Sequence, residues 1–258
     1  MFHINFISFI YVVISYITFV VFVCGVIYKF LIYMKTPQFV NIVLTPSPTS
    51  RKGVYCRMLS NIIFLRTLFK SDKFLWLISY LFHLSFLAIL LQHFLRHITF
   101  DFNSAGGNLS YFYNILLPIG FIIGLVVFVT LLFLLFRRFF IERVKYISLF
   151  QDHFILILLL SIALSGLSQV VFQPVGELNK IMPELDHYFN NLITLKTSNI
   201  PLNPYFLLHY TLILVLLNYL PFSKLIHFIG VIFAPTLNRE DNFSLENKLG
   251  MQDKYPTL

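Results

Sequence analysis

The sequence predicts an all-α integral membrane protein, a bundle of five transmembrane helices with its N-terminus outside and its C-terminus in the cytoplasm. Of the 258 residues, 58% are hydrophobic and only 12% are charged, which is far from the composition of a soluble domain. The apolar residues also fall into long runs, and about 20 helical residues cross a hydrocarbon core of about 30 Å. No soluble domain of any size is expected.

The expected spans follow the apolar runs in order. They cover residues 6–28, 74–95, 114–136, 153–172 and 204–222. A cleaved signal peptide begins with a basic segment, and Met1–Tyr28 contains no Lys or Arg, so the first run is expected to be a retained helix. Residues 1–238 are then one membrane domain, and residues 239–258 are a hydrophilic cytoplasmic tail.

The net charge of +8 is distributed unevenly along the chain. All but three of the Lys and Arg residues lie in three places: from the end of the first span to the start of the second, between the third and fourth spans, and after the fifth span. The exceptions are Arg96, Lys180 and Lys196. Basic residues collect on the cytoplasmic side of a membrane. The charge therefore sets the predicted orientation, and we expect no nucleic-acid partner.

Two segments outside the spans have their own patterns. The stretch RMLSNIIFLRTLFKSDKFLW, residues 57–76, alternates apolar and basic residues at helical spacing and predicts a short interfacial helix on the inner surface. Such a helix contacts membrane lipid, or alternatively docks a cytoplasmic partner. The polar outer segment 173–203, with Pro174, Pro183 and Pro201, is expected to fold over the outer face.

Four histidines carry the functional argument, because an ionisable residue inside a bilayer indicates a function. His83 and His93 lie ten residues apart in the second span, and His209 and His227 lie eighteen apart at the start and just beyond the end of the fifth. These spacings correspond to rises of about 15 Å and about 27 Å, the second being five full turns. Of the other histidines, His97 lies one turn beyond His93, His153 begins the fourth span, and His3 and His187 look like surface residues.

Paired histidines on two helices are typical of b-type haem, whose iron takes neutral imidazole as an axial ligand. The second and fifth spans run antiparallel, so His83 pairs with His227 near the inner surface and His93 with His209 near the outer one. The unequal rises require tilted helices, and Pro221 is placed to bend the fifth. Zinc needs three or four converging ligands, which rings three turns apart do not provide.

The two cysteines add no second cofactor. Cys24 and Cys56 form no C-x-x-C pattern, so neither covalent haem nor an iron–sulfur cluster is expected in this chain. A single membrane histidine more often only bonds a neighbouring helix, but four of them matched in depth favour two haems b.

Several stretches resemble the NarI-like di-haem cytochrome b family, the family of the nitrate reductase gamma subunit, and within it the DsrM branch. They are LTPSPTSRKGVYCRML at 44–59, TLFKSDKFLWLISYLFH at 67–83, LLQHFLRH at 90–97, DHFILILLLSIALSGL at 152–167 and YLPFSKLIHFIGVIFAPT at 219–236. The resemblance spans residues 10–240 and implies that His83, His93, His209 and His227 are the haem ligands. It also implies a quinone site near the outer haem, for which His93, Arg96 and His97 are candidates. The family's lysine at that site has no equivalent between Lys73 and Arg137.

The resemblance implies electron transfer between membrane quinone and a cytoplasmic iron–sulfur subunit. That partner would resemble the catalytic part of heterodisulfide reductase (DsrK-like), together with the other DsrMKJOP members of dissimilatory sulfur metabolism, in the inner membrane of a prokaryote. One alternative is the membrane subunit of a nitrate or heterodisulfide reductase. Another is a haem-free transporter or structural anchor whose histidines relay protons; it would show no b-type absorption band.

Overall fold

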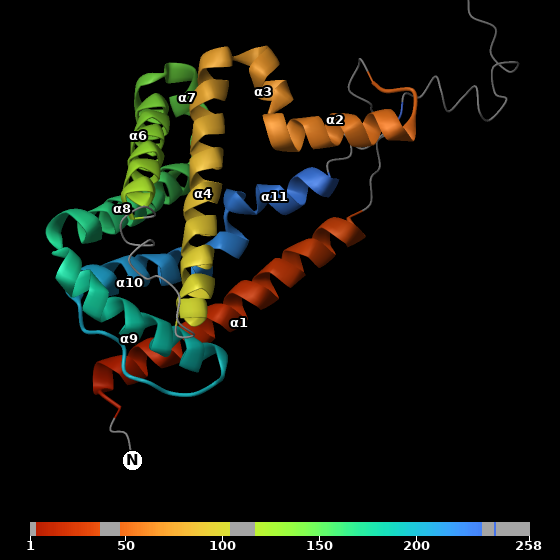
Figure 1. The fold of residues 1–258 in the computed structure, drawn as a ribbon. Coiled ribbons are helices and arrows are strands. Elements are labelled where there is room, and N and C mark those ends of the chain that lie inside the picture. The colour runs from red at the N-terminus through yellow and green to blue at the C-terminus, as the bar shows by residue number, and fades with distance from the viewer. Residues whose placement is uncertain (1–3, 37–46, 104–116, 234–239, 241–258) are drawn as a thin grey trace, which may run out of the picture. The chain divides into compact units, whose positions relative to one another are not determined.

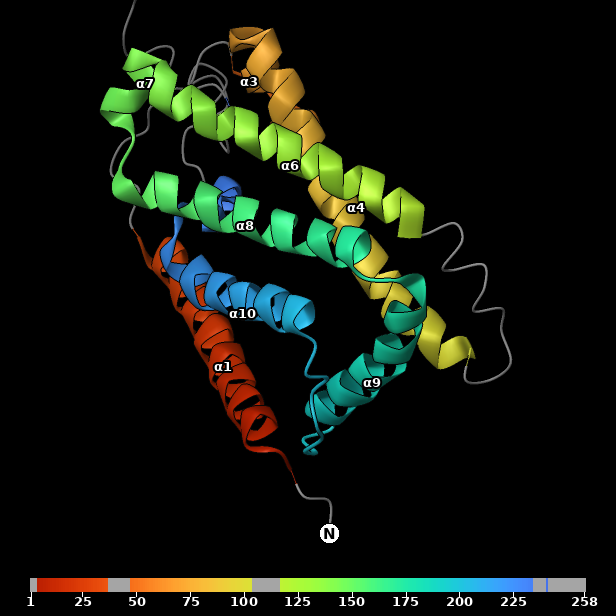
Figure 2. The ribbon, with the colours of Figure 1, turned by 90° about the vertical axis from the view of Figure 1, so that its left-hand side faces the viewer.

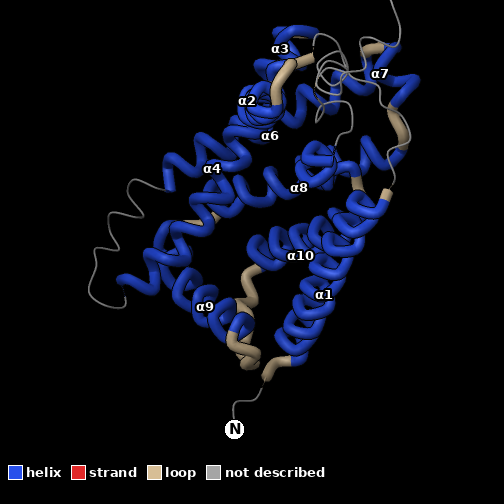
Figure 3. The backbone as a smooth tube through the Cα atoms, turned by 90° about the vertical axis from the view of Figure 1, so that its right-hand side faces the viewer, coloured by secondary structure: helices blue, strands red, loops and turns tan. Residues whose placement is uncertain are grey.

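The computed structural model describes residues 4–36, 47–103, 117–233 and 240, and its regular structure in these ranges is helical throughout (Figures 1 and 3). Five helices in them are long and apolar enough to cross a membrane. These are α1 (Phe6–Lys35), α4 (Lys73–Asn103), α6 (Leu117–Phe140), α8 (Phe150–Phe172) and α10 (Pro204–Tyr219). The predicted five-helix, all-α membrane fold is confirmed, while the orientation of the two ends stays a prediction.

The chain divides into two compact units. The first contains Met1–Val23 and Ile78–Ser223, and the second contains Cys24–Leu77 and Lys224–Leu258. The long helices α1 and α4 each contribute to both. The expected boundary between membrane domain and tail, at residue 238, lies outside the described residues.

In the first unit α8 packs between α6 and α10 (Figure 2). The facing side chains are apolar and buried, with Leu131 of α6 only 1% exposed and Leu158 and Leu159 of α8 nearly as enclosed. A Cβ atom on Gly124 of α6 would lie 3.2 Å from the Leu167 side chain of α8. Glycine therefore lets the two helices approach closely, as small residues do between membrane helices.

A polar seam joins the N-terminal half of α1 to α10. Residues 11, 15 and 18 follow helical spacing and share one face of α1. The hydrogen bonds of the seam join Tyr11 Oη to Thr211 Oγ1 (2.7 Å), Ser15 Oγ to Tyr210 Oη (2.6 Å) and Asn218 Nδ2 to Thr18 Oγ1 (2.6 Å). Because lipid offers these groups no partner, the bonds hold α1 against α10 in one register.

The segment after α8 contains a helix that was not predicted from the sequence, α9 (Val175–Ile193). Its Tyr188 is fully buried and its Leu185 is 4% exposed, in a cluster with Phe206 and Tyr210 of α10. Burial raises the pKa of the Tyr188 phenol, because the charged form loses its hydration. The polar, proline-containing stretch is thus an amphipathic helix packed on the first unit.

A short connection links α6 to α8 through α7 (Glu142–Ile147). Arg138, near the end of α6, donates a hydrogen bond to Ser148 Oγ at 3.0 Å and lies 3.7 Å from the Asp152 carboxylate. Asp152 is 4% exposed and also accepts the backbone N–H of Leu149 at 3.1 Å. The Asp152 carboxylate thus caps the start of α8 and also pairs with the end of α6.

The second unit contains α2 (Arg51–Phe64) and α3 (Arg66–Ser71), where the sequence predicted an interfacial helix. The helical path breaks at Leu65, whose φ is 48°. Trp76 Nε1 donates to the Phe64 carbonyl at 2.8 Å and its ring packs edge-on against Phe69. After α10 the chain continues in short helical segments. The first, η2 (Leu220–Phe222), belongs to the first unit. The next three belong to the second unit: η3 (Lys224–Ile226), α11 (His227–Gly230) and η4 (Val231–Phe233).

Candidate functional site

Three of the four predicted haem ligands lie in the first unit. His83 and His93 project from α4, and both are exposed on the isolated chain. His209 lies near the start of α10 and is partly buried. His227 is the first residue of α11 and belongs to the second unit.

The structure brings together one of the two predicted pairs. His93 and His209 come from different helices of the first unit, and they lie within electrostatic range of one another. An axial pair needs one imidazole from each of two neighbouring helices, and α4 and α10 carry these two histidines. The second predicted pair, His83 and His227, is divided between the two units, so its geometry stays a prediction.

The His209 ring is held by α8. Ser165 Oγ lies 2.9 Å from His209 Nδ1 and 2.9 Å from the Ile162 carbonyl. A carbonyl can only accept, so the single hydroxyl hydrogen of Ser165 goes to Ile162 and its oxygen accepts from His209 Nδ1–H. The ring therefore carries its lone pair on Nε2.

The residue beside Ser165 shapes the same contact. A Cβ atom on Gly166 would lie only 3.1 Å from Cε1 of His209, so any side chain there would crowd the ring. Ser165 and Gly166 lie in the stretch 152–167 that carries part of the family resemblance, but no role was predicted for them. The available signal was a small-residue pair in an otherwise bulky apolar run, which marks close helix contact in membranes.

The other three candidates have the same tautomer. Nδ1 faces the Ser79 carbonyl in His83 (2.7 Å), the Ile89 carbonyl in His93 (2.8 Å) and the Lys224 carbonyl in His227 (3.2 Å). Nδ1 must therefore carry the proton, and the neutral ring presents Nε2 as the electron-pair donor. Ligating histidines commonly have this arrangement, with the second nitrogen bonded to a carbonyl.

The tautomer makes a histidine suitable as a ligand but does not single it out. His153 at the start of α8 makes the same bond, from Nδ1 to the Leu149 carbonyl at 3.1 Å, and its ring packs near Phe139. His187 on α9 accepts from Asn191 at 2.9 Å. His3 and the side chains of Arg96 and His97 lie outside the described residues, so of the predicted quinone site only His93 is described.

The donor chemistry fits a haem with two imidazole ligands. Across the described ranges, no three His, Cys, Asp or Glu side chains converge as a metal site, whereas an axial pair needs only two. His93 and His209 supply that pair in one unit, each with Nδ1 fixed and Nε2 as donor. Cys24 and Cys56 are both exposed and in the second unit.

Comparison with known proteins points in the same direction. Residues 66–239 match the family described as the nitrate reductase gamma subunit, a range that includes all four histidines. The chain is 31% identical over 268 residues to the Hdr-like menaquinol oxidoreductase cytochrome b-like subunit of Archaeoglobus fulgidus, covering 88% of this chain and 78% of the relative. It is 27% identical over 292 residues to the protein of the same description in Archaeoglobus profundus, covering 97% and 84%.

Proposed function

This chain belongs to the nitrate reductase gamma subunit family, and we propose that it is a di-haem cytochrome b subunit that passes electrons between membrane quinol and a cytoplasmic iron–sulfur subunit. It is a multi-pass membrane protein with five spans. The observation that supports the proposal is that His93 and His209 interact electrostatically within one unit, each with its Nδ1 hydrogen-bonded and its Nε2 left as the donor atom.

The chain's own residues hold and orient the cofactors. His93 and His209 bind one haem, and His83 and His227 bind the other. When bound, haem supplies one-electron redox chemistry. Ser165 keeps the proton of His209 on Nδ1, and the backbone carbonyls of Ser79 and Ile89 do the same for His83 and His93. A hydrogen bond from Nδ1–H orients the ring and leaves Nε2 as the atom that faces the iron, as is common in ligating histidines.

The distribution of basic residues and the names of the relatives support this choice of quinol and partner. The related archaeal proteins are named as subunits of an Hdr-like menaquinol oxidoreductase, which favours menaquinol and a heterodisulfide-reductase-like partner over nitrate reductase. We place quinol near the outer end of α4, at His93, Arg96 and His97. The basic residues that follow α1, α6 and α10 would face the cytoplasm and seat a DsrK-like subunit within a DsrMKJOP-type complex of sulfur metabolism.

The deciding experiment is a reduced-minus-oxidised spectrum with pyridine haemochrome quantitation on the purified chain. We expect two haems b per chain for the wild type and one each for His83→Ala and His209→Ala, with different absorption maxima in the two variants. His153→Ala is the matched control, because His153 makes the same Nδ1–carbonyl bond at a membrane helix end. It should retain both haems.

Two results would overturn the proposal. Well-folded wild-type protein without a b-type band would leave the histidines as proton-relay or structural groups of a transporter or anchor. Loss of haem from His153→Ala, with both haems retained in His209→Ala, would show that the ligand set is wrong.

A further inference from the structure

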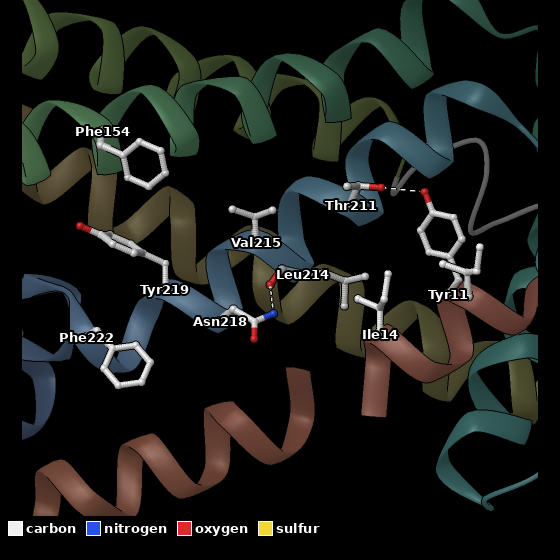
Figure 4. Close-up of a pocket in the computed structure, with 10 residues that line it drawn as sticks. Tyr11, Ile14, Phe154, Thr211, Leu214, Val215, Asn218, Tyr219 and Phe222 are labelled. Carbon is white, nitrogen blue, oxygen red and sulfur yellow. Dashed lines mark hydrogen bonds between the residues drawn. The ribbon is translucent and has the colours of Figure 1, made fainter. Parts of the chain in front are cut away.

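A cavity of about 590 Å³ lies in the first unit between the N-terminal half of α1 and the end of α10 (Figure 4). Each helical residue advances by about 100°, so the lining residues Thr211, Val215 and Asn218 lie across α10 from His209. His209 itself contacts α8. The cavity is therefore separate from the proposed haem site, and its volume is in the range of small-molecule sites.

The cavity walls are mostly apolar, with the hydroxyl groups of Tyr11, Thr211 and Tyr219 and the amide of Asn218 among them, and the Asn218 amide has a fixed orientation. Asn218 Nδ2 donates one hydrogen to the Leu214 carbonyl at 2.9 Å and the other to Thr18 Oγ1 at 2.6 Å. Because a carbonyl can only accept, the amide nitrogen must lie on that side, and Oδ1 points away from Leu214 (Figure 4). No described residue donates a hydrogen bond to Oδ1, so the cavity presents a fixed acceptor.

The end of the cavity beside Asn218 is aromatic (Figure 4). Phe154 of α8 meets Tyr219 edge-on with ring centroids 5.1 Å apart, and Phe222 lies beside them, 59% exposed (Figure 4). Flat rings favour offset or edge contacts of this kind. The site thus combines a surface for a planar ring with an acceptor for a hydroxyl group.

We propose that this cavity binds the hydroxylated aromatic ring of a quinol, with Asn218 Oδ1 accepting a hydrogen bond from one hydroxyl group. A phospholipid acyl chain would fill the apolar walls but carries no donor for Asn218, and an unmatched polar group is costly in lipid. The ligand class rests on the proposed function. The site is additional to the one placed at the outer end of α4, because it lies on the α1 face of α10.

The test uses the full chain in nanodiscs with 2-methyl-1,4-naphthoquinol as competitor and its azido derivative as photolabel. Crosslinked peptides are mapped by mass spectrometry, and the competitor concentration gives the affinity. Asn218→Leu removes the acceptor, whereas Val215→Trp fills the cavity and leaves the acceptor in place. Asn218→Leu should weaken binding about three- to tenfold, the effect of one lost hydrogen bond, and Val215→Trp should weaken it at least as much because the indole occupies the space of the quinol ring. Thr18→Val is the control, since it removes a bond of the α1–α10 seam but keeps Oδ1 and its Leu214 anchor.

The expected result is labelling within residues 10–14 or 211–222, lost in both cavity variants and retained in Thr18→Val. Labelling confined to the outer end of α4, or full affinity in both cavity variants, would overturn the proposal. The proposal would also be overturned if Thr18→Val weakened quinol binding as much as the cavity variants do, or if phospholipid occupied the cavity and the quinol did not displace it. Quinol reduction of the haems in the same preparation shows independently whether the proposed function stands.

Discussion

His209 depends on a neighbouring helix for its orientation, whereas His83 and His93 bond carbonyls of their own helix. Its Nδ1–H goes to Ser165, and the backbone of Gly166 lies against the ring. A small movement of α8 would therefore move this ligand and leave the other two in place. The haem proposed for His93 and His209 should accordingly be the more sensitive to changes in α8.

Gly166→Val tests that sensitivity. The new Cβ alone would lie 3.1 Å from Cε1 of His209, so the branched side chain must push the ring away from its position. We expect one haem to be present in a lower amount or to have a shifted reduction potential, and the other haem to keep its wild-type content and potential. Potentiometric titration of the absorption band measures both. Gly53→Val is the matched control, because its Cβ would also be crowded, 2.7 Å from the Pro48 side chain, beside none of the four candidate ligands or their hydrogen-bond partners. Equal changes in both haems of Gly166→Val would contradict this account.

At the scale of elements, polar contacts decide how the apolar helices meet. Lipid is as apolar as the helix surfaces, so hydrophobic burial contributes little to helix pairing in a membrane. The α1–α10 seam and the small residues of α6 and α8 supply the specific contacts instead. The α6–α7–α8 connection adds a partly buried ion pair between Arg138 and Asp152.

Asp152→Ala should destabilise that connection. The substitution leaves Arg138, whose side chain is 32% exposed, without its carboxylate, and it removes the acceptor of the Leu149 N–H. We expect a loss of about 2 kcal/mol, which lowers the unfolding midpoint by roughly 5 °C in a chain of this size. Thermal unfolding in detergent, followed by circular dichroism, measures it. Glu142→Ala, an exposed acid on the same connection, should stay within about 0.5 kcal/mol of the wild type, and an equal drop there would rule out the ion pair as the cause.

At the scale of the whole molecule, the basic residues after α1, α6 and α10 predict which side of the membrane each connection occupies. The two cysteines make this measurable, because Cys56 lies in α2 and Cys24 within α1, both exposed on the isolated chain. In a membrane, Cys24 is shielded by lipid. Only Cys56 should then report an aqueous side.

We expect a membrane-impermeant maleimide to label Cys56 in inside-out vesicles and not in right-side-out vesicles. Lys196→Cys, made in a Cys56→Ser background, should show the opposite pattern, because Lys196 is exposed in the connection between α9 and α10. Cys24 should be labelled in neither preparation. Labelling of Cys56 from the outer side would reverse the predicted orientation and, with it, the face proposed for the iron–sulfur partner.

Sequence reasoning reached the five spans to within a few residues at most ends, because length and hydropathy are local properties. It ended the first span early, at residue 28, where the helix continues to Lys35, since a helix need not end at the hydrocarbon boundary. It missed α9, because the polar residues and prolines of 173–203 hid the apolar face that carries Leu185 and Tyr188. Ile181, Leu185 and Tyr188 do recur at helical spacing, so the amphipathic signal was present in the sequence.

The sequence by itself determined the membrane class, the five helices and the four candidate ligands, because each follows from hydropathy or from spacing along one helix. Only the tertiary structure decided which residue of another helix bonds to His209, and that α1, α8 and α10 line a cavity. Ser165 meets His209 across 44 residues of sequence, and Asn218 meets Thr18 across 200. Contacts of that separation depend on how helices pack, and helix packing leaves no periodic signal in a single chain.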